Sequence, residues 1–206
     1  MINKFREAIY QIKNALLLLV YLTILTGLIY PGMITAIGQL FFPWQSNGSL
    51  IKQDGQVVGS LLIGQSFTDP KYFYSRPSAT TPYPYNGESS SGSNLGPSNP
   101  SLLAIVKERS LNLQKINPSN TLIPVDLVTT SASGLDPDIS PLAAFYQLSR
   151  IAKLRKLSET TIKDLIQQSI QKRTLGIFGE PRINVLQLNI ALDHLTLRSI
   201  NVKTKT

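Results

Sequence analysis

Three aspartates are the first candidates for chemistry in this 206-residue sequence. Asp126, Asp136 and Asp138 lie within a stretch of thirteen residues. A calcium loop of the EF-hand type needs oxygen ligands at positions 1, 3 and 5 and a glutamate at position 12. Counted from Asp136, that last position is Gln147. Aspartates at a proline-containing turn ordinarily cap and solvate the chain, so we predict a turn here and no metal site.

The pair Asp193-His194 is the second candidate, because it contains the only histidine of the sequence. A histidine beside an aspartate could activate one of the serines in a hydrolase. The G-x-S-x-G turn that carries the nucleophile in many hydrolases does not occur. A histidine near a helix end also interacts favourably with the helix dipole, which is our interpretation of His194. A membrane-anchored extracytoplasmic hydrolase remains the alternative function.

Residue counts exclude several further classes of protein. The absence of cysteine excludes disulfides, a thiol nucleophile and cysteine-based zinc or iron–sulfur sites. A single histidine excludes the H-E-x-x-H zinc motif. Neither the G-x-x-x-x-G-K-[ST] phosphate loop nor the G-x-G-x-x-G dinucleotide motif occurs. We therefore expect no catalytic residues and no covalently bound cofactor.

A charge-free apolar segment explains much of the composition. Residues 15–37 carry no charge, and at about 1.5 Å per residue a helix of this length reaches roughly 34 Å, enough to span a bilayer core. The segment is longer than the core of a cleavable signal peptide, although Ala36 and Gly38 resemble a cleavage site. We predict a cytoplasmic N-terminus at 1–14, a transmembrane helix at 15–37 and an extracytoplasmic domain at 45–206.

Flanking charge sets the expected direction of the helix. Lys4, Arg6 and Lys13 precede it, whereas the next basic residue is Lys52. By the positive-inside rule, the N-terminus lies in the cytoplasm and the chain crosses the membrane once. The formal net charge of +8 would otherwise suggest nucleic acid. A domain outside the cytoplasm rarely meets nucleic acid, so we expect membrane lipid and protein partners instead.

The outer domain is expected to be α+β. Glycine-bounded and β-branched runs predict strands at 57–64 and 125–130. Apolar spacing and capping residues predict helices at 101–113, 140–155, about 158–171 and 185–192. The basic run Arg150, Lys153, Arg155 and Lys156 is interpreted as a solvated helix face, with a phosphate or lipid-headgroup contact as the alternative.

Residues 66–100 form a long irregular segment rich in proline and serine. Segments of this kind are usually disordered or functional. Disordered linkers are poor in aromatic residues, whereas this segment is rich in them, so we expect an ordered loop that contacts a partner. The candidate contact residues are Tyr72, Phe73, Arg76, Tyr83 and Tyr85.

Several collinear motifs carry a resemblance to a known family. They read FPWQSNGSLI from Phe42, YF-x-x-RPSAT from Tyr72, PVDLVT-x-SASGLD from Pro124 and GEP-x-INVL-x-LN-x-ALD from Gly179. Over about residues 28–193 the sequence closely resembles the C subunit of the Kdp-type potassium-transporting ATPase, the KdpC family. The resemblance implies a small accessory, non-catalytic subunit in the inner membrane of a bacterium.

The resemblance also implies partners and a role. The partners would be a potassium-binding channel-like subunit, a P-type ATPase subunit and a small single-helix subunit of an ATP-driven potassium uptake complex. Gly27 and Gly32 would let the transmembrane helix approach partner helices closely.

The family is described as a catalytic chaperone that raises the affinity of the ATPase subunit for ATP. A glutamine after S-P-x-A-A has been connected with nucleotide; here it is Gln147, followed by Arg150 and Lys153. ATP would be reached through the ATPase subunit. Because the predicted topology puts Gln147 outside the cytoplasm, we expect its nucleotide role to be indirect.

Overall fold

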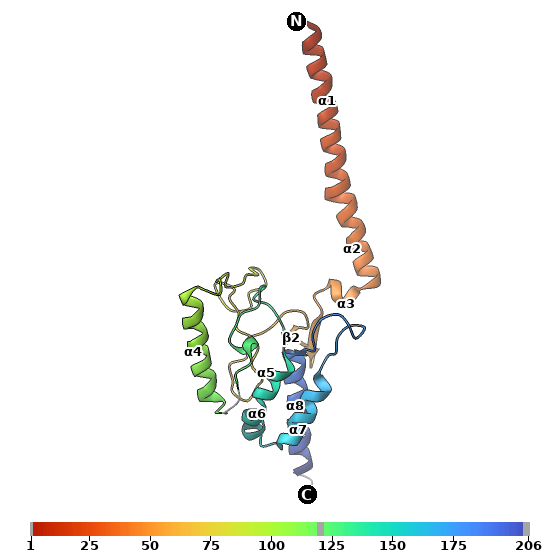
Figure 1. The fold of residues 1–206 in the computed structure, drawn as a ribbon. Helices are drawn as coiled ribbons and strands as arrows, with labels where there is room; N and C mark the ends of the chain where they lie inside the picture. The colour runs from red at the N-terminus through yellow and green to blue at the C-terminus, as the bar shows by residue number, and fades with distance from the viewer. Residues whose placement is uncertain (1, 119–121, 204–206) are drawn as a thin grey trace. The chain divides into compact units, whose positions relative to one another are not determined.

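The computed structural model describes residues 2–118 and 122–203 and divides the chain into two units, Met1–Ser49 and Leu50–Thr206. The first unit consists of α1 (Ile2–Ile24), a π-helical turn η1 (Leu25–Ile29), α2 (Tyr30–Phe41) and the short α3 (Pro43–Ser46) (Figure 1). Helix Lys4–Phe41 is long and apolar enough to cross a membrane, and none of its apolar window is buried. The segment predicted to span the membrane lies entirely within it.

Pro31 does not end this helix, although a proline there could have marked its exit from the membrane. The π-turn precedes Pro31 directly, and the N–H of Tyr30 donates to the carbonyl of Leu25, five residues back. Proline lacks an N–H and its ring crowds the carbonyl of the preceding turn. The widened turn falls where the regular α-helical hydrogen bonds are hardest to keep, and α2 continues beyond it.

The second unit is a mixed helical and β domain, which confirms the predicted α+β class. Its helices are α4 (Pro100–Ile116), α5 (Pro141–Tyr146), α6 (Leu148–Arg155), α7 (Glu159–Ser169) and α8 (Val185–Lys203). β1 (Leu50–Gln53) pairs antiparallel with β2 (Gln56–Ser60), and β3 (Asp138–Ile139) pairs antiparallel with β4 (Ile183–Asn184). In Figure 1, α5 to α8 lie together and α4 lies at one edge of the unit.

The predicted helix starts are confirmed by side-chain caps. Asn99 and Ser140 accept hydrogen bonds from the N–H groups of Ser101 and Ala143, at 2.9 and 3.1 Å. Ser158 and Asn184 cap α7 and α8 in the same way, each at 3.1 Å. Such caps satisfy N–H groups that have no partner inside the helix, so short polar side chains fix where each helix begins.

Other expectations about the elements are wrong. The strand expected at 125–130 is a 3-10 turn, η2 (Val125–Leu127). Leu127 and Val128 are both buried, whereas a strand would point neighbouring side chains to opposite faces. The helix expected at 140–155 is two helices, because the chain turns at Gln147. Helix α8 runs past residue 192 to Lys203, so His194 lies inside the helix rather than near its end.

The core of the second unit is formed mainly by α5 to α8 and by one residue of the long irregular segment. Phe73, from that segment, is fully buried among helical side chains. The fully buried aliphatic residues around it are Ile139, Ile151, Ile162, Ile166, Ile183, Leu188 and Leu192. The segment therefore belongs to the hydrophobic core, and α5 to α8 position it.

Candidate functional site

Residues 70–74, called the clamped segment below, begin in a turn, where the N–H of Tyr72 donates to the carbonyl of Asp69 at 3.0 Å, and are held by side chains instead of by a neighbouring strand. The side-chain amide of Asn189 accepts from the N–H of Phe73 at 2.9 Å and donates to its carbonyl at 3.0 Å. Gln147 does the same for Tyr74, at 2.7 and 3.2 Å. A carboxamide offers one acceptor and two donors, so each can substitute for a peptide group of an adjacent strand.

Gln147 is fully buried, and its hydrogen bonds lie within the protein. Besides the two to Tyr74, its nitrogen donates to the carbonyl of Ala143 at 3.2 Å and its oxygen accepts from Arg150 at 2.7 Å. Gln147 was predicted to be associated with nucleotide, but in this structure both polar atoms of its side chain form hydrogen bonds within the domain. The arrangement positions the clamped segment on α5 and α6.

Arg150 is the second buried group of the clamp. Its guanidinium donates to the carbonyls of Pro70 and Tyr72 and, at 2.8 Å, to the side-chain oxygen of Asn117. It also lies over the ring of Tyr74, 4.3 Å from the centroid. Burial lowers the pKa of Arg150 to about 10, which leaves the side chain charged at neutral pH. Among the described residues, no carboxylate forms an ion pair with it.

Arg155 and Asp193 hold the other side of the clamped segment. Arg155 pairs with Asp193 at 2.7 Å and donates to the carbonyl of Lys71 at 3.0 Å. The hydroxyl of Tyr72 donates to the second oxygen of Asp193 at 3.0 Å, and the guanidinium of Arg155 lies 4.6 Å from the Tyr72 ring centroid. Asp193 therefore contacts Arg155 and Tyr72 and does not orient His194 as the carboxylate of a catalytic triad would.

The basic run from Arg150 to Lys156 is only partly the solvated face that we expected. Arg150 and Arg155 turn inward and bind backbone carbonyls of the clamped segment, while Lys153 and Lys156 are exposed. Contact with the clamped segment explains this, because Arg150 donates to the carbonyls of Pro70 and Tyr72 and Arg155 to that of Lys71. The prediction of a solvated face is wrong for both arginines.

The rest of the long irregular segment is ordered by contacts with residues 131–136. Arg76 forms an ion pair with Asp136 at 2.9 Å, and the hydroxyl of Ser78 donates to the carbonyl of Gly134 at 2.7 Å. The hydroxyl of Tyr85 donates to the carbonyl of Arg76. The three aspartates first considered as metal ligands all form contacts within the domain. Asp136 pairs with Arg76, Asp138 pairs with Arg182, and Asp126 accepts a hydrogen bond from the N–H of Ser140.

A test of this ordering comes from Tyr85. Burial raises the pKa of its hydroxyl to about 12. An unfolded tyrosine loses its proton near pH 10, so between about pH 10 and 12 the unfolded state binds fewer protons and stability falls as the pH rises. By urea unfolding, the wild type should lose about 1 kcal/mol more than Tyr85→Phe on going from about pH 9 to about pH 11. Equal losses in the two proteins would contradict the buried hydroxyl.

The residues expected to contact partners are distributed differently from the prediction. Phe73 is buried in the core, and Tyr72, Arg76 and Tyr85 use their polar groups inside the domain. Tyr83 is exposed and remains a candidate. Gly27 and Gly32 lie on the exposed helix of the first unit, where a Cβ atom would meet nothing within 4 Å. Their role as points of close approach for a partner helix stays a prediction.

A hairpin at residues 171–182 presents an apolar tip that the sequence reasoning missed. Backbone hydrogen bonds join Gln171 to Arg182 and Thr174 to Phe178, and Arg173 pairs with Glu180 at 2.6 Å. At the tip, Leu175, Ile177 and Phe178 are 84%, 73% and 63% exposed. The available signal was three large apolar residues around glycines, directly between charged residues.

Taken together, the long apolar helix and the internally paired α+β domain define a class of protein: one helix able to cross a membrane, followed by a domain whose buried polar side chains stabilise its own loops. The family model described as "K+-transporting ATPase, c chain" (KdpC) matches residues 12–194. The chain belongs to the KdpC family. Membership makes it a membrane-associated subunit of a potassium-transporting ATPase complex rather than a self-contained protein.

Curated relatives agree over nearly the full length. A potassium-transporting ATPase KdpC subunit from Methylococcus capsulatus is 55% identical over 196 residues, which is 95% of this chain and 100% of the relative. The KdpC subunit from Herpetosiphon aurantiacus is 56% identical over 184 residues, 89% of this chain and 95% of the relative. That from Polynucleobacter asymbioticus is 56% identical over 182 residues, 88% of this chain and 96% of the relative.

Proposed function

We propose that this chain is a non-catalytic accessory subunit that assembles and stabilises an ATP-driven potassium uptake complex in a bacterial inner membrane. Its partners are the channel-like potassium-binding subunit, the P-type ATPase subunit and the small single-helix subunit. The observation that carries this proposal is the family match over residues 12–194, which spans both the apolar helix and the α+β domain. The internal use of Asp193 supports a binding role over the alternative hydrolase.

The finer role is to raise the affinity of the ATPase subunit for ATP, and Gln147 and Arg150 contribute to it indirectly. Both are buried and hold the clamped segment, so they keep the domain in the form that partners recognise. Lys153 is exposed on α6 and is the member of this group that can reach another molecule without a change of fold. No cofactor is held by this chain covalently.

The apolar hairpin tip is the main docking surface for a partner subunit. Exposed apolar side chains in a small cluster, with charged residues beside them, are typical of protein interfaces. Burying one such side chain contributes about 1.5–3 kcal/mol, so the three together can supply much of a stable contact. Beside the tip, Arg173 and Arg182 already pair with Glu180 and Asp138, so Lys172 is the basic residue there that favours an acidic group on the partner.

Co-purification tests this assembly role. The double variant Ile177→Ser/Phe178→Ser should keep the circular dichroism spectrum of the wild type but reduce recovery of the partner subunits in mild detergent by at least about tenfold. Leu103→Ser, an equally exposed apolar position on α4, is the matched control and should retain full recovery. Unchanged recovery with the double variant would contradict docking through the hairpin.

The proposed orientation places the N-terminus in the cytoplasm and residues 45–206 outside. Protease added to intact cells whose outer membrane has been permeabilised should digest this domain and leave the anchor segment. Residue 2 tagged with an epitope should stay protected under the same conditions. Protection of the domain with exposure of the tag would reverse the topology and allow direct contact between Lys153 and cytoplasmic ATP.

A further inference from the structure

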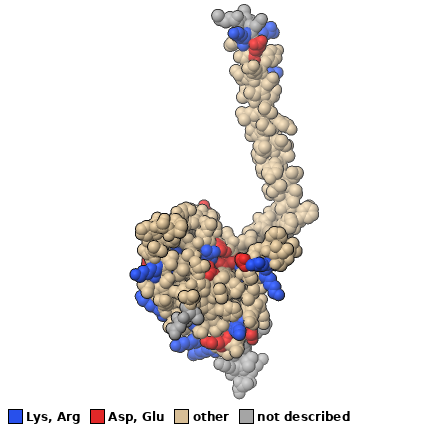
Figure 2. Space-filling model, in the orientation of Figure 1, with Lys and Arg blue, Asp and Glu red and all other residues tan. Residues whose placement is uncertain are grey.

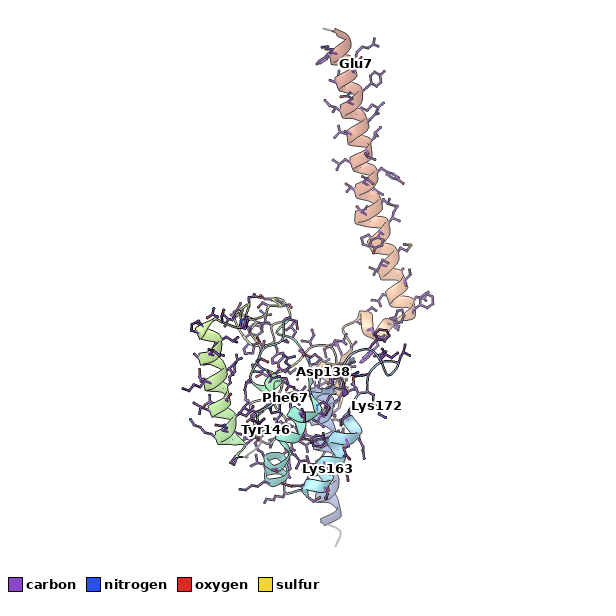
Figure 3. All side chains as sticks on the ribbon, in the orientation of Figure 1. Glu7, Phe67, Asp138, Tyr146, Lys163 and Lys172 are labelled. Atoms are coloured by element: carbon purple, nitrogen blue, oxygen red, sulfur yellow. The ribbon has the colours of Figure 1, made fainter. Side chains whose placement is uncertain are left out.

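A cavity of about 570 Å³ lies between the end of α4 and the start of α6. One part of its wall is apolar and the other part is polar and basic. The apolar lining residues include Ile116 and Leu154, and the polar ones include Asn117, Tyr146, Arg150 and Lys153. Figure 2 shows Lys and Arg side chains gathered over the part of the second unit where α6 lies. Tyr146 is labelled in Figure 3.

Two buried polar atoms of this wall have no hydrogen-bond partner among residues 2–118 and 122–203. They are the side-chain nitrogen of Asn117 and the hydroxyl of Tyr146. Asn117 is only 4% exposed, and its side-chain oxygen already accepts from Arg150, which leaves its side-chain nitrogen as the donor that lacks an acceptor. Buried donors without an acceptor destabilise a fold and are rare in native proteins. A ligand with acceptor oxygens would satisfy both groups.

The charged side chains around the cavity indicate that the ligand carries a negative charge. The guanidinium of Arg150 is buried among neutral acceptors, and Lys115 and Lys153 add two ammonium groups to the lining. Carbonyl oxygens at the end of α4 oppose an anion, but Lys115 lies in that same last turn and offsets them. No Asp or Glu is among the described residues that line this cavity. An oxyanion would supply the missing counter-charge.

From these observations we infer that the cavity binds an amphiphile in which a phosphate or carboxylate is attached to an aliphatic chain. The oxyanion accepts from Asn117 and Tyr146 and lies near Lys115 and Lys153, and the chain packs on Ile116 and Leu154. The site goes beyond the proposed assembly role, since it needs no partner subunit.

The test uses the full chain in nanodiscs of zwitterionic lipid, with empty nanodiscs as background. Decanoate and dihexanoyl phosphatidic acid, both below micelle formation, are titrated by calorimetry beside inorganic phosphate and ATP. Tighter binding of decanoate assigns the site to a free carboxylate, and tighter binding of the phosphatidic acid assigns it to a lipid phosphate. Both amphiphiles should bind at least about tenfold more tightly than inorganic phosphate, because the chain adds apolar contact.

Two substitutions separate a ligand site from a merely structural pocket. Tyr146→Phe removes the unpartnered hydroxyl, so the thermal midpoint without ligand should stay or rise while amphiphile affinity falls by at least about threefold. Asn117→Asp removes the donor and gives Arg150 a carboxylate partner. The midpoint should rise, and affinity should fall by at least about tenfold.

A third comparison uses lysines. Lys115→Gln combined with Lys153→Gln should weaken binding by at least about tenfold, whereas Lys163→Gln, on α7 (Figure 3), should not. The inference is overturned if neither amphiphile binds, or if the Asn117→Asp protein binds as the wild type does. It is equally overturned if inorganic phosphate binds as tightly as the amphiphiles, or if ATP displaces them.

Discussion

Replacing Gln147 with methionine should remove a large part of the stability of the α+β domain. The side chain keeps its volume but loses its four hydrogen bonds, which leaves the N–H and carbonyl of Tyr74 and one N–H of Arg150 without partners in a buried site. Each unpaired buried group costs about 1–3 kcal/mol, so we expect a loss of at least about 3 kcal/mol. Domains of ordinary size have only about 5–15 kcal/mol in total.

The same variant separates an indirect role in ATP affinity from a direct one. Thermal unfolding in mild detergent and the ATP KM of the assembled complex should change together for Gln147→Met. Lys153→Met, at an exposed position on the same helical segment, is the matched control for stability and should leave the unfolding midpoint unchanged. A raised KM for Gln147→Met with an unaltered unfolding midpoint would instead indicate that the glutamine contacts the nucleotide. It would contradict the interpretation that Gln147 acts only by holding residues 70–74.

Substituting Gly134 with alanine should release the irregular segment from its support. Gly134 has φ +67°, and a Cβ atom there would lie 2.5 Å from the carbonyl oxygen of Ser91 and 2.7 Å from a methyl group of Thr80. The left-handed backbone costs a side chain about 1–2 kcal/mol, and overpacking adds about 1–3 kcal/mol. Because the nearest atom belongs to the backbone, a rotamer change cannot relieve the contact, and we expect a loss of about 3 kcal/mol.

Gly55→Ala is the matched control for that substitution. Gly55 has φ +80°, but a Cβ atom there would meet nothing within 4 Å. It should therefore lose only the conformational part, about 1 kcal/mol. Limited proteolysis should cut Gly134→Ala between residues 75 and 95 much faster than Gly55→Ala or the wild type. Equal rates of cleavage would show that the contacts between this segment and residues 131–136 do not hold it in place.

The candidate clamp illustrates where sequence reasoning stops. Gln147 was singled out by the family resemblance, and its burial could not be read from the sequence because glutamines are mostly exposed. Its partner Tyr74 lies 73 residues away in the chain, and Asn189 lies 116 residues from Phe73. No periodicity links such distant positions. For the same reason the aromatic loop was interpreted as a partner surface, although Phe73 belongs to the core.

The sequence by itself determined the features that depend on neighbouring residues. The charge-free run at 15–37 defines an apolar helix, and short polar residues such as Ser140, Ser158 and Asn184 fix helix starts, because both effects act within a few residues. The motifs that follow one another along the sequence were likewise sufficient to identify the family.

Only the tertiary structure decided which charged and aromatic side chains face inward. Arg150 and Phe73 are buried and Arg155 is partly buried by contacts between α6, α8 and residues 70–74, elements that meet only when the chain folds. The cost of burying a charge is met by distant carbonyls, and such pairings leave no local signature in the sequence.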